Sequence, residues 1–213
     1  MGQQHGTNVA IPVGDVELDG ILAIPPDASG VVVFAHGSGS SRHSPRNNFV
    51  AEVLRDRGLG TLLFDLLTER EDEVRENRFD VPLLTDRLVA ATRWLSDLAD
   101  AHNLPVGYFG ASTGAAAALR AAARDPEGVA AVVSRGGRVD MATDALAAVD
   151  VPTLFIVGGA DTQVLDLNRE ASDQLTCEKE LHVVDGAGHL FEGPGELEEV
   201  ADVAADWFEA TLA

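Results

Sequence analysis

The sequence predicts an α/β fold, a mostly parallel twisted sheet with helices on both faces. Short apolar runs of strand length alternate with segments of helical periodicity from residue 31 onward. The run 31–35 is apolar at every position, which is typical of a strand buried on both faces. The length of 213 residues suits one core, so we expect a single domain over residues 1–213.

Strands are expected where apolar residues alternate or run together between turn-forming residues. Two antiparallel strands joined at Gly14-Asp15 open the chain, and buried strands follow. The expected strands cover residues 9–13, 16–24, 31–35, 61–66, 106–109, 129–134, 153–157 and 180–184.

Helices are expected where apolar residues recur every three or four positions. The expected helices cover residues 48–57, 83–99, 112–124, 142–149, 165–175 and 194–212. Gly58 ends the first of them. The charged stretch 68–80 has little apolar periodicity, and we expect an exposed loop there.

The charge balance narrows the choice of partners. The chain has 35 acidic and 15 basic residues, a formal net charge of −20. Such an acidic protein repels nucleic acid and anionic membranes, so we expect neither as a partner. No apolar run approaches the roughly 20 residues of a membrane-spanning helix, and the polar segment 1–10 lacks a signal sequence. We therefore expect a cytoplasmic protein, a monomer or a small homo-oligomer.

The segment Gly110-Ala111-Ser112-Thr113-Gly114 follows the expected strand 106–109 and opens the helix 112–124. This is the G-x-S-x-G pattern in a strand–turn–helix context, where the turn presents the serine hydroxyl at the top of the sheet. Glycines two positions before and after the serine let the strand and the helix approach closely. A serine hydroxyl is a weak nucleophile unless a base activates it, so the motif requires a base and an acid elsewhere.

Both partners follow Ser112 in the chain. Asp161 comes directly after the expected strand 153–157 and the glycines behind it, and His189 lies on the loop after the last strand. The order Ser112, Asp161, His189 matches a known order of catalytic triads on α/β sheets. His189 would take the proton from Ser112, and Asp161 would orient His189. Asp140, after the preceding strand, is the alternative acid.

The strand 31–35 leads into His36-Gly37-Ser38-Gly39. A serine hydrolase needs backbone N–H groups directed at the oxyanion of the tetrahedral intermediate. We expect one from Thr113 and the other from Ser38, with Gly39 as the alternative. We assign His36 a structural role, holding this loop by hydrogen bonds.

Together, His36-Gly37, the turn around Ser112, Asp161 and His189 resemble the α/β-hydrolase superfamily. The short length and lack of an inserted lid are similar to its dienelactone-hydrolase-like branch. Further segments resemble a group often encoded with or fused to phosphoribosyltransferases, and the resemblance covers roughly residues 10–212. These segments are 37–47, 63–68, 134–138 and 188–192.

The resemblance implies a single-domain α/β-hydrolase without a lid domain. Dienelactone hydrolase itself uses a cysteine nucleophile, whereas this chain has Ser112. That difference moves the expectation toward a serine hydrolase, a carboxylesterase-like enzyme that cleaves small carboxylic esters or thioesters. The alternative is a non-catalytic module of the same fold that partners a phosphoribosyltransferase-type protein.

Three arginines follow predicted strand ends and are candidates for substrate binding, namely Arg42, Arg46 and Arg135. They would recognise a carboxylate or phosphate on a small-molecule ester. The alternative is that they pair with the abundant acidic residues and order the loops. No metal-ligand spacing and no phosphate-binding glycine loop is present, and the single Cys177 rules out a multi-cysteine site, so we expect no metal and no cofactor.

Overall fold

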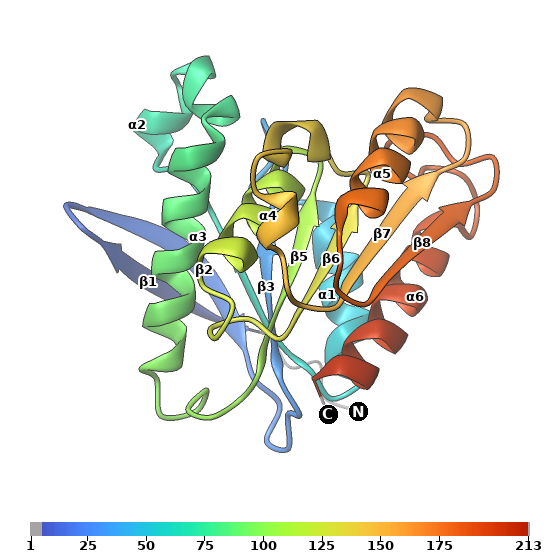
Figure 1. The fold of residues 1–213 in the computed structure, drawn as a ribbon. Coiled ribbons are helices and arrows are strands. Elements are labelled where there is room, and N and C mark those ends of the chain that lie inside the picture. Colours follow the sequence, from blue (N-terminus) through green and yellow to red (C-terminus); the bar gives the residue numbers. More distant parts are fainter. Residues whose placement is uncertain (1–5, 213) are drawn as a thin grey trace.

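The computed structural model describes residues 6–212. Its centre is an eight-stranded sheet in the order β1-β2-β4-β3-β5-β6-β7-β8 (Figure 1). The pairs β1–β2 and β2–β4 are antiparallel, and every other neighbouring pair is parallel. The strands are β1 (Thr7–Val13), β2 (Val16–Ala23), β3 (Val31–Ala35), β4 (Gly60–Phe64), β5 (Val106–Ala111), β6 (Ala131–Arg135), β7 (Thr153–Gly158) and β8 (Lys179–Val184).

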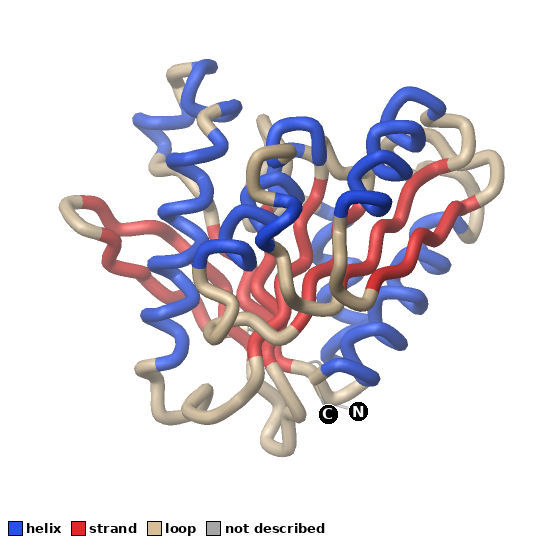
Figure 2. Tube along the Cα trace, viewed as in Figure 1, coloured by secondary structure: helices blue, strands red, loops and turns tan. Residues whose placement is uncertain are grey.

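Helices cover both faces of this sheet (Figure 2). The α-helices are α1 (Pro45–Asp56), α2 (Glu69–Asp72), α3 (Val81–Ser96), α4 (Thr113–Arg124), α5 (Thr162–Gln174) and α6 (Glu196–Thr211). Helices α1 and α6 pack together on one face, and α3 and α4 pack together on the other. The predicted α/β fold, a mostly parallel sheet between two helical layers, is therefore confirmed.

The alternation of side chains along β3 shows why its sequence is apolar throughout. Val31 and Val33 belong to the core cluster beneath α3 and α4, whereas Val32 and Phe34 belong to the cluster beneath α1 and α6. Successive side chains of a strand point to opposite faces. A strand covered on both faces must therefore be apolar at odd and even positions alike.

Two sequence predictions about local structure were wrong. Residues 68–80 are exposed or half-buried, but they are not a loop, because they form α2 and the 3₁₀ helix η1 (Arg75–Phe79). Thr68 caps α2 through a capping box with Glu71, which stabilises even this single turn. The helix predicted over 142–149 is instead two short 3₁₀ helices, η2 (Val139–Ala142) and η3 (Leu146–Ala148).

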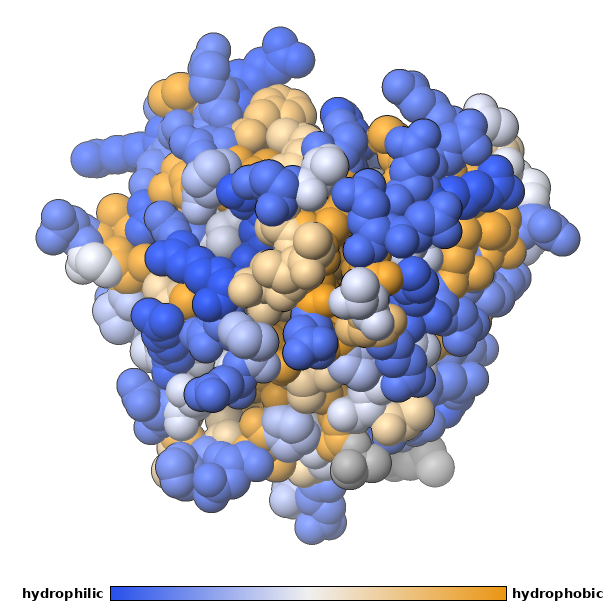
Figure 3. Space-filling model, viewed as in Figure 1, coloured by the Kyte–Doolittle hydropathy of each residue, from blue (hydrophilic) through white to orange (hydrophobic). Residues whose placement is uncertain are grey.

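The surface in Figure 3 is mainly hydrophilic, as the acidic composition predicts. Among residues 6–212, three large apolar side chains remain exposed, namely Val74, Phe79 and Leu190. Over residues 6–212, no helix is both long enough and apolar enough to cross a membrane. The parallel strands β3 to β8 all end at one edge of the sheet, called the carboxyl edge below. Ligand sites in such sheets form at that edge.

Candidate active site

Ser112 lies in a strained turn between β5 and α4. Its backbone has φ 51° and ψ −116°, a conformation with positive φ that non-glycine residues rarely adopt. Gly114 permits the turn, because a Cβ atom there would lie 2.1 Å from the carbonyl oxygen of Ala35. Gly110 is equally constrained, with a Cβ position 2.5 Å from Ala115 Cα. The sequence thus folds into a sharp strand-to-helix turn with Ser112 at its tip.

The segment 135–138 after β6 holds this turn and also contacts His189. Ser112 N–H donates to the carbonyl of Arg135 at 3.1 Å, and Arg138 N–H donates to the carbonyl of Ser112 at 3.0 Å. A Cβ on Gly136 would lie 3.4 Å from His189 Cε1 and Nδ1. Ser112 and His189, 77 positions apart in the sequence, therefore flank one four-residue segment.

His189 is bound to Asp161. His189 Nδ1 lies 2.7 Å from Asp161 Oδ2. The ionised carboxylate can only accept, so Nδ1 carries the proton and Nε2 is left as the acceptor. Within residues 6–212 Ser112 Oγ makes no hydrogen bond to His189. Catalytic hydrogen bonds of this kind often form only when substrate binds.

The loops that carry Asp161 and His189 are joined along their backbones. Gly159 N–H donates to the carbonyl of Val184 at 2.8 Å, and Ala160 N–H donates to the carbonyl of Ala187 at 2.9 Å. A Cβ on Gly158 would lie 2.3 Å from that Ala187 oxygen, so the close approach needs glycine. Asp161 and His189 are consequently held as one unit.

Asp140, the alternative acid, lies elsewhere. Both of its carboxylate oxygens accept from Arg138, each at 2.8 Å. The hydrogen bond from Arg138 lowers the pKa of this carboxyl. Asp140 is thus engaged by an arginine, while Asp161 is the carboxylate on His189.

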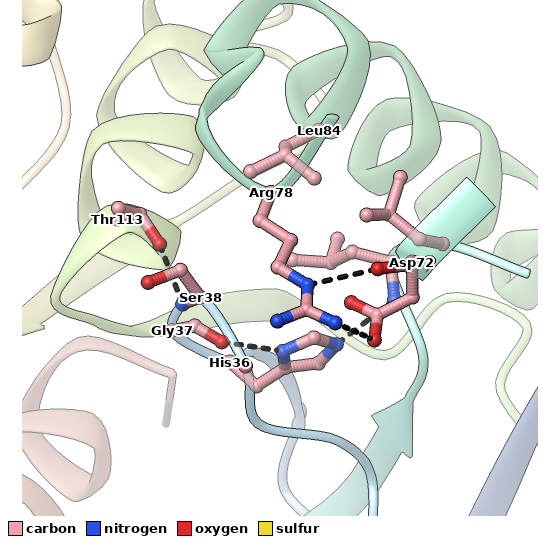
Figure 4. Close-up of a pocket in the computed structure, with 10 residues that line it drawn as sticks. His36, Gly37, Ser38, Asp72, Arg78, Leu84 and Thr113 are labelled. Atoms are coloured by element: carbon pink, nitrogen blue, oxygen red, sulfur yellow. Dashed lines mark hydrogen bonds and ion pairs between the residues drawn. The ribbon is translucent and has the colours of Figure 1, made fainter. Parts of the chain in front are cut away.

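Ser38 and Thr113, the two candidate oxyanion residues, are in direct contact. Ser38 N–H donates to Thr113 Oγ1 at 2.9 Å (Figure 4). Thr113 is the first residue of α4, so its own N–H has no intrahelical acceptor. Gly39 has φ +71° in a turn closed by Ser40 N–H on the carbonyl of Gly37. The Thr113 hydroxyl would have to turn away from Ser38 for both amides to reach one oxygen atom.

His36 is buried beneath this loop. Leu66 N–H donates to His36 Nε2 at 3.1 Å, so Nδ1 carries the proton and donates to the carbonyl of Gly37 at 2.9 Å. Burial lowers the pKa of His36, which keeps the ring neutral. The neutral ring thus links the loop after β3 to the chain after β4 and plays no part in proton transfer.

The structure adds Arg78, a residue that the sequence analysis missed. It lines a cavity of about 10 Å³, room for one water molecule, together with His36, Ser38 and Thr113. Its guanidinium donates to the Asp72 carbonyl at 2.9 Å and to the Asp72 carboxylate at 2.8 Å (Figure 4). The T-x-x-E capping signature at Thr68 was the sequence signal that could have revealed a folded segment here.

Two of the three candidate substrate-binding arginines are paired with acidic residues. Arg42 binds Asp65 through both its guanidinium and its backbone N–H, and Asp19 lies 3.5 Å away. Arg46 donates to the Leu190 carbonyl at 2.9 Å and to the Glu192 carboxylate at 2.8 Å. Arg42 therefore orders the loop after β3, and Arg46 orders the loop after His189.

Arg135, the third, is different. It ends β6, is only 8% exposed, and its Nε and Nη1 atoms are buried without a hydrogen-bond partner. Its guanidinium lies over the Phe191 ring, 5.6 Å from the ring centroid. Among residues 6–212, no cluster of three or more His, Cys, Asp or Glu side chains could hold a metal ion.

Comparisons with known proteins agree with this fold. A family model described as an alpha/beta hydrolase domain matches residues 28–206. Two Mycobacterium tuberculosis proteins named "Putative phosphoribosyl transferase" are 56% identical over 200 residues, which cover 94% of this chain and 45% of each relative. The chain thus spans about half the length of these relatives.

Solved structures give the same picture. The crystal structure of a dienelactone hydrolase from Anabaena variabilis is 54% identical, with a TM-score of 0.97 and 100% of both chains covered. Est1E from Butyrivibrio proteoclasticus is 16% identical, with a TM-score of 0.83 over 97% of this chain and 99% of that one. The second likeness concerns the fold alone.

Proposed function

The chain belongs to the alpha/beta hydrolase domain family, and from that premise we propose that it is a serine hydrolase that cleaves small carboxylic esters or thioesters. Ser112 would attack the carbonyl carbon, and His189 Nε2 would accept the hydroxyl proton. The proton would then pass to the leaving group as the acyl-enzyme forms. Water, activated by the same imidazole, would release the acid and regenerate Ser112.

The observation that carries this proposal is the 2.7 Å contact between His189 Nδ1 and Asp161. This contact fixes the tautomer in which Nε2 can act as a base, and it stabilises the imidazolium that forms during attack. The strained backbone of Ser112, with φ 51°, supplies a nucleophile beside the same segment that His189 contacts. A protein that only needed to fold would gain nothing from this strain.

The oxyanion would be held by the Thr113 and Ser38 amides. Thr113 N–H lies at the start of α4, where the helix dipole also favours negative charge. In the structure Ser38 N–H is bound to Thr113 Oγ1. We propose that the substrate oxygen replaces that hydroxyl as the acceptor, so that the Ser38 amide is exchanged between two partners during turnover.

A fluorophosphonate probe tests the nucleophile directly. The wild-type protein should be labelled, with the adduct on Ser112, and Ser112→Ala should not be labelled. Assays with p-nitrophenyl acetate, butyrate and octanoate should show turnover that declines with chain length and disappears in the same variant. A folded wild-type protein that neither labels nor turns over any of the three esters would contradict the proposal. That result would favour a non-catalytic module acting beside a phosphoribosyltransferase-type protein.

A further inference from the structure

Arg135 stands out among the arginines of the carboxyl edge because it lacks a counter-ion. Its side chain forms no ion pair and no hydrogen bond within residues 6–212, although the chain holds 35 acidic residues. Burial, with a smaller contribution from nearby Arg46, lowers its pKa to about 10, so the guanidinium stays charged near neutral pH. A buried charge without a partner is costly, and natural proteins normally pair it.

The surroundings hold this guanidinium in place without neutralising it. The Phe191 ring lies beneath it at 5.6 Å, a cation–π contact. Phe191 has φ 52°, a strained conformation for a bulky side chain, two positions after His189. Arg46 binds the carbonyl of Leu190 and the carboxylate of Glu192, on either side of Phe191. The strained backbone of Phe191 thus places an aromatic ring, rather than a carboxylate, against Arg135.

The position of Arg135 relates it to the reacting atoms. Its carbonyl accepts from Ser112 N–H at 3.1 Å, and the next residue, Gly136, contacts the His189 ring. The residue is thus part of the segment that flanks both the nucleophile and the base. Arg46 is near enough to lower the pKa of Arg135, but its own guanidinium is bound to Glu192.

We propose that Arg135 binds an anionic group of the substrate, a carboxylate or a phosphate, beside the ester that Ser112 attacks. This inference rests on the proposed function and specifies its substrate class. The anion supplies the missing counter-ion, so binding it gains a charge-assisted hydrogen bond in a poorly solvated place. Neutral esters would still be cleaved, but without this contribution.

The test compares anionic and neutral esters on the wild type and on Arg135→Met. On the acyl side the pair is mono(4-nitrophenyl) adipate and 4-nitrophenyl hexanoate. On the alcohol side, 4-acetoxybenzoate and 4-acetoxyphenyl phosphate are compared with neutral 4-acetoxybenzamide. We expect Arg135→Met to lower kcat/KM for at least one anionic ester by about 10- to 100-fold, and for the neutral esters by no more than about 3-fold. The ester whose kcat/KM falls in Arg135→Met shows whether the anion is a carboxylate or a phosphate. It also shows whether the acyl side or the alcohol side of the substrate carries that anion.

Arg120→Met is the matched control. It removes the same charge from Arg120 of α4, an arginine that pairs with Asp144. Arg120→Met should leave the ratio of kcat/KM between anionic and neutral esters unchanged. Arg135→Lys, which keeps the charge but loses the guanidinium fork, should give an intermediate loss. It also serves as the readout if Arg135→Met does not fold. Equal effects of Arg135→Met or Arg135→Lys on anionic and neutral esters would overturn the inference.

A binding readout separates this inference from the proposed function. Inorganic phosphate or glutarate should raise the melting temperature of Ser112→Ala, and should not do so in Ser112→Ala/Arg135→Met. If the neutral esters are hydrolysed but no anion discriminates between the variants, the anion site is wrong and the hydrolase remains. If no ester is hydrolysed but the anion stabilises only the protein with Arg135, the hydrolase is wrong and the anion site remains.

Discussion

The two sides of the carboxyl edge differ in one buried arginine. On the β3–β4 side, formed by the loops after those strands and by residues 68–80, Arg42 and Arg78 are each bound to a carboxylate. Arg87 of α3 is bound to Glu71 of the same segment. On the β5–β8 side, Arg135 is as deeply buried as any of them and has none. The first side uses charge to fold its loops. The second leaves a charge unneutralised beside Ser112, the proposed nucleophile, and perturbed groups of this kind cluster at functional sites.

Backbone strain shows the same division. The β3–β4 side makes its sharp turn with a glycine, Gly39 at φ +71°. The β5–β8 side places Ser112 and Phe191 at φ 51° and 52°. Glycine adopts this region at little cost, while a side chain there is strained. The strain therefore concentrates where the chemistry is proposed.

The largest expected effect comes from exchanging one carboxylate on each side. Asp161→Asn should keep the fold and lower kcat by about 10³- to 10⁴-fold, because the amide holds His189 in the wrong tautomer. Asp65→Asn, on the β3–β4 side, should lower kcat by less than about 10-fold, since it acts only through loop order. Steady-state ester hydrolysis measures both. Equal losses of kcat from the two variants would contradict the proposal that the chemistry belongs to the β5–β8 side alone.

Stability should respond in the reverse order. Asp65 accepts from the backbone and the guanidinium of Arg42, and both side chains are largely buried. Asp65→Asn should therefore lower the free energy of unfolding by about 1–3 kcal/mol, measured by urea denaturation. Asp161→Asn should change it less, because the amide still forms a hydrogen bond with His189 Nδ1, now as the donor. A more stable Asp65→Asn protein would contradict the structural role of this ion pair.

Arg135→Met and Arg42→Met compare the loss of an unpaired arginine with the loss of a paired one. Removing Arg42 leaves Asp65 without its partner and should lower the melting temperature by several degrees. Removing Arg135 replaces an unpaired buried charge with an apolar chain of similar length and should leave the melting temperature unchanged or raise it. Thermal unfolding in low salt compares them. A larger loss from Arg135→Met would mean that its charge stabilises the fold.

The smallest expected effect concerns pH and His36. Burial lowers the pKa of His36 in the folded state below its ordinary value of about 6.5. Below about pH 6.5 the unfolded chain therefore takes up a proton that the folded chain resists, so stability is lost as the pH falls. The difference in unfolding free energy between the wild type and His36→Gln should narrow from pH 8 to pH 5. A difference independent of pH would show that His36 is not held neutral.

Much of this architecture could be read from the sequence, because apolar periodicity and glycine position are local signals. The order of strands and helices, the turn at Ser112, and the placement of Asp161 and His189 after strand ends all follow from such signals. The short helix α2 was also encoded locally, in the pair Thr68 and Glu71, but the charged composition concealed it. Local signals failed at η2 and η3, where tertiary packing breaks a weak helical pattern.

Local signals in the sequence could not show which polar side chain pairs with which partner. Arg42 and Arg135 look alike in the sequence, each a few residues from a strand end. Only the fold shows that Arg42 meets Asp65, 23 positions away, and that Arg135 meets a phenyl ring. Likewise, the bond from Ser38 N–H to Thr113 Oγ1 joins residues 75 positions apart. Pairing of this kind depends on which loops the sheet brings together.

The backbone bonds between the Asp161 loop and the His189 loop have a consequence for how the family can diversify. Asp161 and His189, the proposed acid and base, lie on joined loops after β7 and β8, while Ser112, the proposed nucleophile, follows β5. Exchanging oxygen for sulfur at position 112 would therefore change the leaving-group preference without disturbing the proton carrier. One change of codon at position 112 would replace the alcohol with a thiol, so a relative could change its nucleophile while it keeps Asp161 and His189 in place.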